Sequence, residues 1–314
     1  MSTLRLATRG SPLALRQSEL VADALRAAHP GLLAELVVIR TRGDESSVPL
    51  DQIGGQGVFV TEVEAAVADG RAEAAVHSAK DMTSVMADHL VLAAVPPRAD
   101  PRDGLVGCAL ADLPPGGLIA TGSARRRAQL ANLRPDLIFT EVRGNMERRV
   151  ARGEDGSVTA VVVAVAAMAR LGWLHRLSDT LDPMDVLPQA GQGAIAVQCR
   201  AVDNGTRQLL AAIDHPASHR AVRAERAVLA GLGGSCSVPV GAWAESDGET
   251  QLLRVHGLVA SGDGRTMIRM SLTGEDPDAV GAALARTLLV EGGGSGIDAF
   301  EAVAHPGADA QAAR

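Results

Sequence analysis

The segment LRLATRGSPLALRQSELVADALRAAHPGLLAELVVIRT (residues 4–41) carries the pattern that decides the fold class. Leu4–Thr8 is predicted to form a strand, and Leu36–Thr41 is predicted to form the next one. Between them Ser11-Pro12 predicts the start of a helix, because serine is a good N-cap and proline suits the first helical position. The helix is expected to end at Pro30-Gly31. A strand, a helix and a strand in this order predict a βαβ unit and a mostly parallel sheet.

The same alternation continues along the rest of the chain. Pro96-Pro97 followed by Asp100-Pro101 predicts the end of a first α/β unit, and a last unit begins at about Pro216. The other expected elements are a helix at 58–68, strands at 74–77, 90–95 and 119–121, a helix at 124–133, strands at 137–140, 158–165 and 194–199, a helix at 216–229, three strands between 240 and 272, and a helix from about 277. The pattern therefore predicts an α/β protein of two or three domains.

The composition argues against several classes of function. The formal net charge is −7, the pI is about 5.6, and the chain has three Phe, two Trp and no Tyr. Nucleic-acid binders use basic surfaces and aromatic stacking platforms, so no nucleic-acid partner is expected. The longest apolar run, Ala160–Ala169, is too short to span a bilayer, and the first residues lack the apolar core of a signal peptide. Three distant cysteines without metal-ligand spacing (Cys108, Cys199 and Cys236) favour a reducing cytoplasm.

The segment AVHSAKD (Ala75–Asp81) contains the only lysine, because 29 of the 30 Lys and Arg residues are arginine. Lys80 is either the survivor of an arginine-favouring codon bias or a site that needs a compact ammonium. Asp81 can form an ordinary surface ion pair with it, or can stay ionised among cations and stabilise a positive intermediate. His77 is better explained as a hydrogen-bonded structural residue than as a base.

Three expected strand-to-helix junctions carry polar and basic residues. They are Thr8-Arg9-Gly10-Ser11, the segment TGSARRR (Thr121–Arg127), and Arg143-Gly144-Asn145 with Arg148 and Arg149 one turn later. Helix N-termini and arginine forks favour carboxylate or phosphate, and ligands of open α/β sheets bind at the carboxyl ends of strands. We therefore expect an anion site, although a solvated helix face is the commoner explanation for any single arginine. The chain has no GxxxxGK[ST] or GxGxxG motif, which weakens a nucleotide-binding interpretation.

Cys236 lies in GGSCSVPVG (Gly233–Gly241), a loop of small residues after an expected helix. Such a loop can expose a thiol to a bulky ligand, whereas a semi-buried inert thiol is the default for a single cysteine. Cys108 and Cys199 lie in apolar strand contexts and are assigned no role.

Taken together, these segments resemble the porphobilinogen deaminase (hydroxymethylbilane synthase) family over nearly the whole chain. AVHSAKD and the Cys236 loop are the most specific matches. The matching segments are LATRGSPLAL (6–15), TRGD (41–44), GGQGVF (54–59), AVHSAKD (75–81), DPRD (100–103), TGSARR (121–126), VRGN (142–145), LPQAGQGA (187–194), RAERA (223–227) and GGSCSVPVG (233–241).

The resemblance implies a transferase of porphyrin and heme biosynthesis. Such an enzyme condenses four porphobilinogen molecules head to tail, releases ammonia at each step and yields the linear tetrapyrrole hydroxymethylbilane. The resemblance also implies a dipyrromethane cofactor, bound by a thioether to the cysteine that matches Cys236, and a catalytic aspartate that matches Asp81. The residues that would hold the cofactor are Ser78, Lys80, Thr121, Ser123, Arg125 and Arg126. Those that would hold the substrate or the growing chain are Arg9, Ser11, Arg143, Arg149, Arg170 and Gln192. Each pyrrole carries an acetate and a propionate, which gives the arginines a chemical reason.

The implied fold has two doubly wound domains around a cleft, like those of periplasmic binding proteins, and a smaller C-terminal α/β domain. Domain 1 is then residues 1–96 plus about 191–213, domain 2 is residues 99–190, and domain 3, which carries Cys236, is residues 216–314. A cytoplasmic monomer without a metal or a membrane partner is expected.

Three positions depart from the family pattern. Gln56 and Thr61 stand where the family often has lysine, and Thr83 stands where it usually has proline. Two other functions remain open. A non-catalytic small-anion solute-binding module suits the same two-domain cleft and predicts no pyrrole on Cys236. A cysteine hydrolase would pair Cys236 with His77, but no Cys-His motif supports it.

Overall fold

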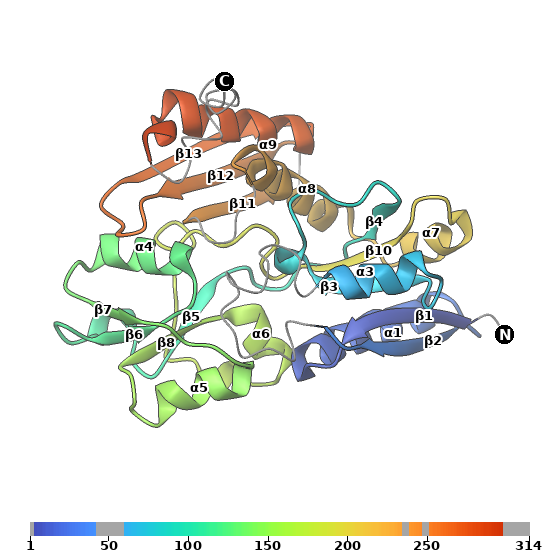
Figure 1. The fold of residues 1–314 in the computed structure, drawn as a ribbon, viewed down its shortest axis with the longest axis horizontal. Coiled ribbons are helices and arrows are strands. Elements are labelled where there is room, and N and C mark those ends of the chain that lie inside the picture. Colours follow the sequence, from blue (N-terminus) through green and yellow to red (C-terminus); the bar gives the residue numbers. More distant parts are fainter. Residues whose placement is uncertain (1–2, 42–59, 234–238, 247–250, 298–314) are drawn as a thin grey trace, which may run out of the picture. The chain divides into compact units, whose positions relative to one another are not determined.

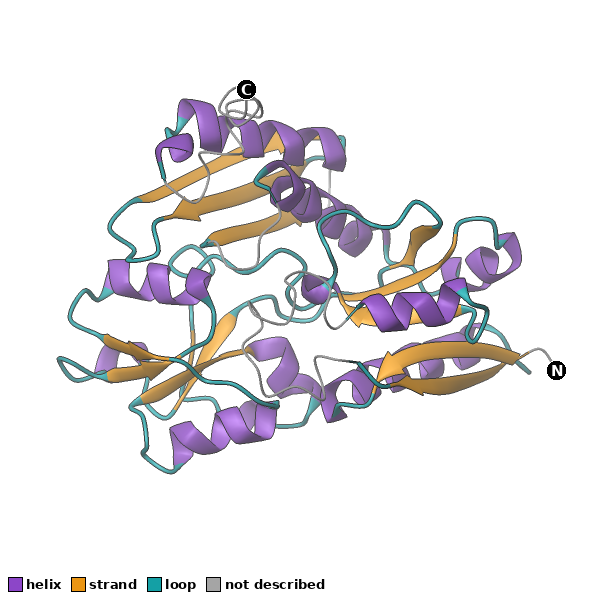
Figure 2. Cartoon of the chain, viewed as in Figure 1, coloured by secondary structure: helices purple, strands orange, loops and turns teal. Residues whose placement is uncertain are grey.

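The computed structural model describes residues 3–41, 60–233, 239–246 and 251–297. They form an α/β protein, as predicted, and its strands make three sheets (Figures 1 and 2). The chain divides into two compact units: unit 1 comprises Met1–Pro101, Ala166–Trp173 and Gly191–Val222, and unit 2 comprises Arg102–Val165, Leu174–Ala190 and Arg223–Arg314. Within the described ranges, no helix is both long enough and apolar enough to cross a membrane.

The sheet of unit 1 has five strands in the order β2-β1-β3-β10-β4. Its strands are β1 (Thr3–Arg9), β2 (Leu33–Ile39), β3 (Ala74–Ser78), β4 (Leu90–Ala94) and β10 (Ile195–Arg200), and its helices are α1 (Pro12–Ala28), α3 (Thr61–Ala68) and α7 (Asn204–Ala211). β1 runs parallel to β2 and β3, but β10 is antiparallel to both β3 and β4. β4 therefore runs in the same direction as β1, β2 and β3, so four of the five strands are parallel, as expected, and β10 alone is reversed.

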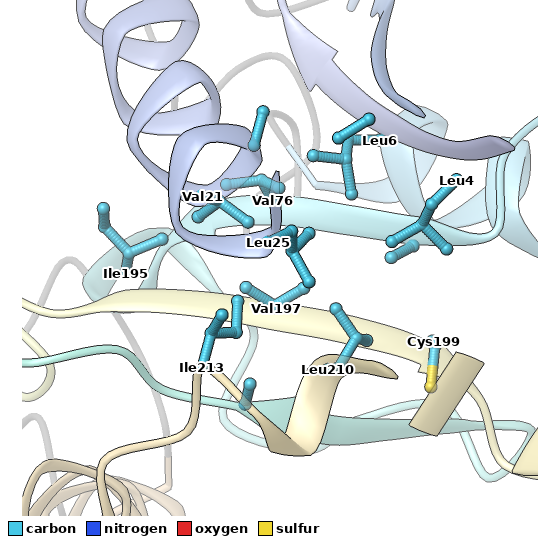
Figure 3. Packing of buried hydrophobic residues seen from close by; sticks show 14 of the residues in the cluster. Leu4, Leu6, Val21, Leu25, Val76, Ile195, Val197, Cys199, Leu210 and Ile213 are labelled. Atoms are coloured by element: carbon cyan, nitrogen blue, oxygen red, sulfur yellow. The ribbon is translucent and has the colours of Figure 1, made fainter. Parts of the chain in front are cut away.

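Helices cover both faces of this sheet. Leu4 and Leu6 of β1 pack in one core with Val21 and Leu25 of α1 (Figure 3). Ala7, the neighbour of Leu6, belongs to a separate core with apolar residues of α3. Successive residues of a strand point to opposite faces, so α1 lies on one face and α3 on the other. This is the doubly wound arrangement predicted for the first domain.

Ser11 caps α1 as predicted. Its side chain accepts a hydrogen bond from the amide of Ala14, and Pro12 occupies the first helical turn. The helix ends at Ala28, and Gly31 has a φ of 89°, a conformation that favours glycine. The resulting turn brings β2 back beside β1.

Unit 2 contains a second five-stranded mixed sheet, in the order β7-β6-β8-β5-β9. Its strands are β5 (Asp103–Val106), β6 (Leu118–Ala120), β7 (Ile138–Thr140), β8 (Ala160–Ala164) and β9 (Asp179–Thr180), and its helices are α4 (Ala124–Leu133) and α5 (Met146–Glu154). Ala160 and Val162 of β8 share a core with Leu130 of α4, and α5 also packs against β8. The strand predicted at 158–165 is shorter than expected, because α6 (Val165–Arg170) begins directly after β8.

The third sheet also belongs to unit 2 and is antiparallel, in the order β11-β12-β13. Its strands are β11 (Val240–Ser246), β12 (Leu253–Ala260) and β13 (Met267–Gly274), preceded by α8 (Pro216–Gly231) and followed by α9 (Pro277–Arg286) and a π-helical turn at Thr287–Glu291. α9 packs on β12 and β13 (Figure 1). The three strands between residues 240 and 272 were predicted. The division of the chain into three domains, with boundaries near residues 96–99 and 213–216, stays a prediction.

Candidate active site

A pocket of unit 1 lies at the carboxyl ends of β1 and β3. It encloses about 380 Å³, including the solvent at its mouth, and is lined by Arg9, Ser11, Leu13, Ala14, Gln17, Val60, Val76, His77, Ser78 and Asp81. β1 and β3 are parallel neighbours, so their carboxyl ends meet at one edge of the sheet. The start of α1 lies at the same edge, because α1 follows β1 after a short turn. Ligands of α/β sheets bind at such an edge.

Asp81 reaches this pocket from the end of a short 3-10 helix, Ala79–Asp81, which follows β3. Asp81 is exposed, while Ala79 is buried and donates its amide to the carbonyl of Ala194. Ser78, the last residue of β3, accepts a hydrogen bond from the side-chain amide of Gln17 at 2.9 Å. The segment before Asp81 is thus held through the Ser78 hydroxyl and the Ala79 amide, while the Asp81 carboxylate remains accessible to a ligand.

Lys80 is directed to Gln192. Its ammonium donates to Oε1 of Gln192 at 3.2 Å, and the Nε2 of Gln192 donates to the carbonyl of Pro101 at 2.7 Å. The backbone carbonyl of Gln192 accepts a bond from Nε of Arg98 at 2.9 Å. Gln192 is fully buried, and its amide is occupied by these partners. Lys80 and Gln192 were both predicted to contact the ligand. In the structure, the side chain of Gln192 holds the Lys80 ammonium in place.

The glycine on each side of Gln192 is required by close packing. Gly191 and Gly193 have φ values of 76° and 86°. A Cβ on Gly191 would lie 2.8 Å from the carbonyl carbon of Ala79, and one on Gly193 would lie 2.5 Å from the carbonyl oxygen of Ala99. The turn at residues 191–193 therefore fits directly against the segment that carries Lys80 and Asp81.

Arg170, the last residue of α6, also meets this turn. One of its terminal nitrogens donates to the carbonyl of Gly193 at 2.7 Å. Within the part of the chain that the structure describes, no acidic side chain pairs with it. Burial lowers the pKa of Arg170 to about 10, so the guanidinium remains charged at neutral pH. A partly buried cation without a carboxylate is suited to bind an anion.

In unit 2, Arg125 and Arg126 lie in the first turn of α4. The cap of this helix is Ser123, whose side chain accepts from the amide of Arg126, and Thr121 accepts from the amide of Ser123 at 3.2 Å. Both guanidinium groups bind one carboxylate: Arg125 reaches Oδ2 of Asp103 at 2.8 Å and Arg126 reaches Oδ1 at 2.7 Å. All three charged side chains are buried.

This cluster keeps unused capacity for an anion. Two guanidinium groups share one carboxylate, so the three side chains together carry one positive charge. Burial, the largest influence, lowers the pKa of Arg125 despite its attraction to Asp103. Among the described residues, the Nε of Arg125 is buried and has no hydrogen-bond acceptor. An unused donor in a net positive cluster fits a ligand with carboxylate groups, such as a dipyrromethane.

Arg143 and Arg149 lie around the start of α5, also in unit 2. Arg143 is exposed and pairs with Glu141 at 3.1 Å, and Nε of Arg149 donates to the carbonyl of Gly144 at 2.8 Å. Asn145 caps the helix by accepting from the amide of Arg148. The exposed first turn of α5 is thus a second basic helix start in the same unit as Arg125.

The structure brings the predicted residues together in two groups. In unit 1, Arg9, Ser11, Ser78 and Asp81 line the pocket, and Lys80 and Arg170 bind the turn at residues 191–193, which contains Gln192. In unit 2, Thr121, Ser123, Arg125 and Arg126 lie at the start of α4, and Arg143 and Arg149 lie around the start of α5. Cys236 and Gln56 lie outside the described residues, and Thr61 is the exposed first residue of α3.

Sequence reasoning assigned no role to Gln17 or Asp103. Gln17 is a buried polar residue on the packed face of α1, and this is a signal that the helix pattern offers. Asp103 was part of the matched segment DPRD, but its partners are 22 and 23 residues away, and no local pattern predicts such a pair.

Comparisons with known proteins identify the family. Residues 4–208 match the family model described as "Porphobilinogen deaminase, dipyromethane cofactor binding domain", and residues 219–290 match "Porphobilinogen deaminase, C-terminal domain". The chain belongs to the porphobilinogen deaminase family. Membership confirms the predicted resemblance, the enzyme class and the dipyrromethane-binding domain, and it speaks against a non-catalytic solute-binding module.

Individual relatives support the same family assignment. The chain is 46% identical over 297 residues to porphobilinogen deaminase of Roseiflexus sp. (strain RS-1), a match that covers 93% of this chain and 97% of the relative. It is 45% identical over 298 residues to that of Roseiflexus castenholzii, with the same coverage. Among solved structures, a periplasmic arginine-binding protein of Salmonella typhimurium is 14% identical, with a TM-score of 0.39 over 68% of this chain and 92% of the other. The sequence matches carry the assignment.

Proposed function

We propose that this member of the porphobilinogen deaminase family condenses four porphobilinogen molecules into hydroxymethylbilane, with Asp81 as the catalytic residue. The observation that carries the proposal is the pocket at the ends of β1 and β3, which is lined by Asp81, by the cationic Arg9 and by Ser11. One residue can stabilise positive charge there, and the others can hold the carboxylates of the same small molecule.

In each step the aminomethyl group of a porphobilinogen, which is a protonated ammonium at neutral pH, leaves as ammonia when its carbon–nitrogen bond breaks. A positive charge then develops on the pyrrole methylene until the new carbon–carbon bond forms and the attacked ring loses a proton. The Asp81 carboxylate stabilises this charge and accepts hydrogen bonds from pyrrole N–H groups. Arg9 and the hydroxyl of Ser11 hold the acetate or propionate of the substrate at the start of α1, where the positive end of the helix dipole favours an anion.

The cofactor residues are proposed to be Ser78, Lys80, Thr121, Ser123, Arg125 and Arg126, with Cys236 as the attachment point. The bound dipyrromethane supplies the primer to which pyrroles are added. The unused Nε of Arg125 and the positive charge of its cluster with Asp103 support this role. Lys80 supports it through an ammonium that Gln192 orients.

The remaining cations are proposed to bind substrate or the growing chain. Arg170 is supported by its lack of an acidic partner among the described residues and by its single bond to the carbonyl of Gly193. Arg143 and Arg149 are supported by their place at the start of α5. Gln192 acts on the ligand through Lys80. Each added pyrrole brings two more carboxylates, so a growing chain needs several such cations.

Intact mass of the purified protein tests the cofactor proposal. Wild-type protein from cells that make porphobilinogen should show an excess equal to two pyrrole units, and Cys236→Ala should lose it. Cys108→Ala is the matched control, because Cys108 is a free, partly exposed thiol and should keep the excess. An unmodified wild-type mass, or an adduct that persists in Cys236→Ala, would refute the attachment.

We also propose a cytoplasmic monomer. Cys108 and Cys199 are free thiols in the structure, which suits a reducing compartment. The net charge of −7 supports the absence of a nucleic-acid partner. Light scattering coupled to gel filtration should give a mass near 32.3 kDa, and a dimer mass would contradict the monomer.

A further inference from the structure

Gln129 forms a side-chain clamp on the backbone of Leu187. It lies in α4, one turn after Arg125, and is fully buried. Its Oε1 accepts the amide of Leu187 at 2.7 Å, and its Nε2 donates to the carbonyl of Leu187 at 3.1 Å. The side-chain amide therefore pairs with both backbone groups of residue 187, in the way that a neighbouring strand would.

The clamped residue in turn holds Arg125. The carbonyl of Leu187 accepts a second bond, from Nη1 of Arg125 at 2.5 Å, while Nη2 of Arg125 binds Asp103. Both terminal nitrogens of Arg125 are thus fixed, and the Nε without an acceptor is left pointing in one direction. That direction depends on Leu187, and the position of Leu187 depends on Gln129.

The same clamp is linked to the C-terminal sheet. Arg269 of β13 donates to Oε1 of Gln129 at 3.1 Å and to the carbonyl of Asp185 at 2.5 Å. Next to Leu187, the carbonyl of Pro188 accepts the amide of Ala242 in β11 at 3.0 Å. β11 begins at Val240, four positions after Cys236 in the sequence. All these residues belong to unit 2.

We propose that Gln129 is a positioning residue for cofactor capture. By clamping Leu187 it sets the direction of the Arg125 guanidinium, and through Arg269 and Pro188 it sets the register of the strand that follows the attachment cysteine. A carboxylate-binding arginine and the strand after Cys236 take their relative position from one buried amide. This inference rests on the proposed roles of Arg125 and Cys236 and extends them to a residue that touches neither ligand nor thiol.

The alternative is that Gln129 only stabilises the fold. Asn132 offers the matched control, because it lies one turn further along α4 and donates to the carbonyl of Gly264, in the turn between β12 and β13, at 3.0 Å. It too joins α4 to the C-terminal sheet, but it has no bond to Leu187 or Arg125. Gln129→Met and Asn132→Leu each replace a side-chain amide by an apolar group of similar size.

The experiment follows cofactor capture by the full chain, prepared without cofactor in cells that cannot make porphobilinogen. Porphobilinogen is added, and intact mass records the rate at which two pyrrole units become attached. We expect Gln129→Met to slow attachment at least tenfold and Asn132→Leu to stay within about twofold of wild type. Thermal unfolding before and after loading gives a second readout, because a ligand bound only to the folded state raises Tm. That rise should shrink in Gln129→Met and persist in Asn132→Leu.

The behaviour of the Gln129 variants decides between a positioning role and a purely structural one. Gln129→Met that captures the cofactor at the wild-type rate and shows the full rise in Tm would reduce Gln129 to a structural residue and overturn the proposal. If Gln129→Met does not fold, Gln129→Glu keeps the acceptor for Leu187 and Arg269 but loses the donor to the Leu187 carbonyl, and slow capture is again expected. Wild-type-like capture by that variant would equally overturn the proposal. A wild-type chain that never gains two pyrroles would instead refute the proposed attachment on which the inference rests.

Discussion

Replacing Asp103 by asparagine tests the buried charge cluster at the start of α4. Asp103 is fully buried and accepts bonds from Nη2 of Arg125 at 2.8 Å and from Nε and Nη2 of Arg126 at 3.1 and 2.7 Å. Asparagine has the same shape, but it removes the negative charge and turns one acceptor into a donor that faces a guanidinium. Removing one partner of a buried ion pair costs about 3–5 kcal/mol. For a unit of this size the loss corresponds to a fall in Tm of roughly 6–20 °C.

Urea unfolding of the cofactor-free chain measures this loss where it occurs. The chain has two tryptophans, and Trp243 lies in β11 of unit 2 whereas Trp173 belongs to unit 1. In a Trp173→Phe background the fluorescence therefore reports on unit 2 alone. Asp136→Asn is the matched control, because Asp136 pairs with Arg134 at the surface and should leave the midpoint nearly unchanged. An Asp103→Asn midpoint equal to that of wild type would show that the arginines do not depend on Asp103, and the electrostatic reasoning would fail.

Three further predictions concern single side chains. Asp81→Ala should lower kcat by roughly 100-fold or more with an unchanged circular dichroism spectrum, because Asp81 is exposed; wild-type turnover would remove it from the mechanism. Arg170→Met removes a cation whose burial lowers its pKa to about 10, so Tm of the unloaded chain should hold or rise while KM for porphobilinogen increases roughly tenfold; a lower Tm with unchanged KM would contradict this. Burial raises the pKa of Glu73, but hydrogen bonds from Arg5 outweigh this and leave it below 4.5. Its stabilising effect is therefore present above pH 4.5 and is lost as the pH falls through the lowered pKa. The difference in urea midpoint between Glu73→Gln and wild type should shrink over that acid range, and a constant difference would argue against the Arg5 pair.

Local features of the fold could be predicted because local physics determines them. Ser11 and Pro12 predict the start of α1, because serine forms the capping bond and proline has a fixed φ that suits the first turn. The structure places both residues as expected. The apolar run from residue 158 to 165 was less informative. Val165 already belongs to α6, and a continuous apolar run does not distinguish the end of a strand from the start of a buried helix.

Features that depend on distant residues could not be predicted. The arginines of α4 indicated an anion site, but nothing near them revealed that Asp103 already occupies part of it. The clamp of Gln129 on Leu187 joins residues 58 positions apart, and in the sequence Gln129 is only one more polar residue of a helix. The motif segments were recognisable because the chemistry of the site restricts them, whereas the contacts that orient them are set by packing.

The antiparallel strand β10 has a consequence for synthesis on the ribosome. β10 stands between β3 and β4 in the finished sheet, yet it is made about a hundred residues after them, and it brings Ile195, Val197 and Cys199 to the core around Leu4 and Leu6. Until residue 200 has left the exit tunnel, β3 keeps an open edge and that core lacks one wall. The five strands of the second sheet, by contrast, are complete at Thr180. We therefore expect the second sheet to form first in the nascent chain, and the segment before residue 101 to wait, with apolar surface exposed to chaperones, for its own last strand.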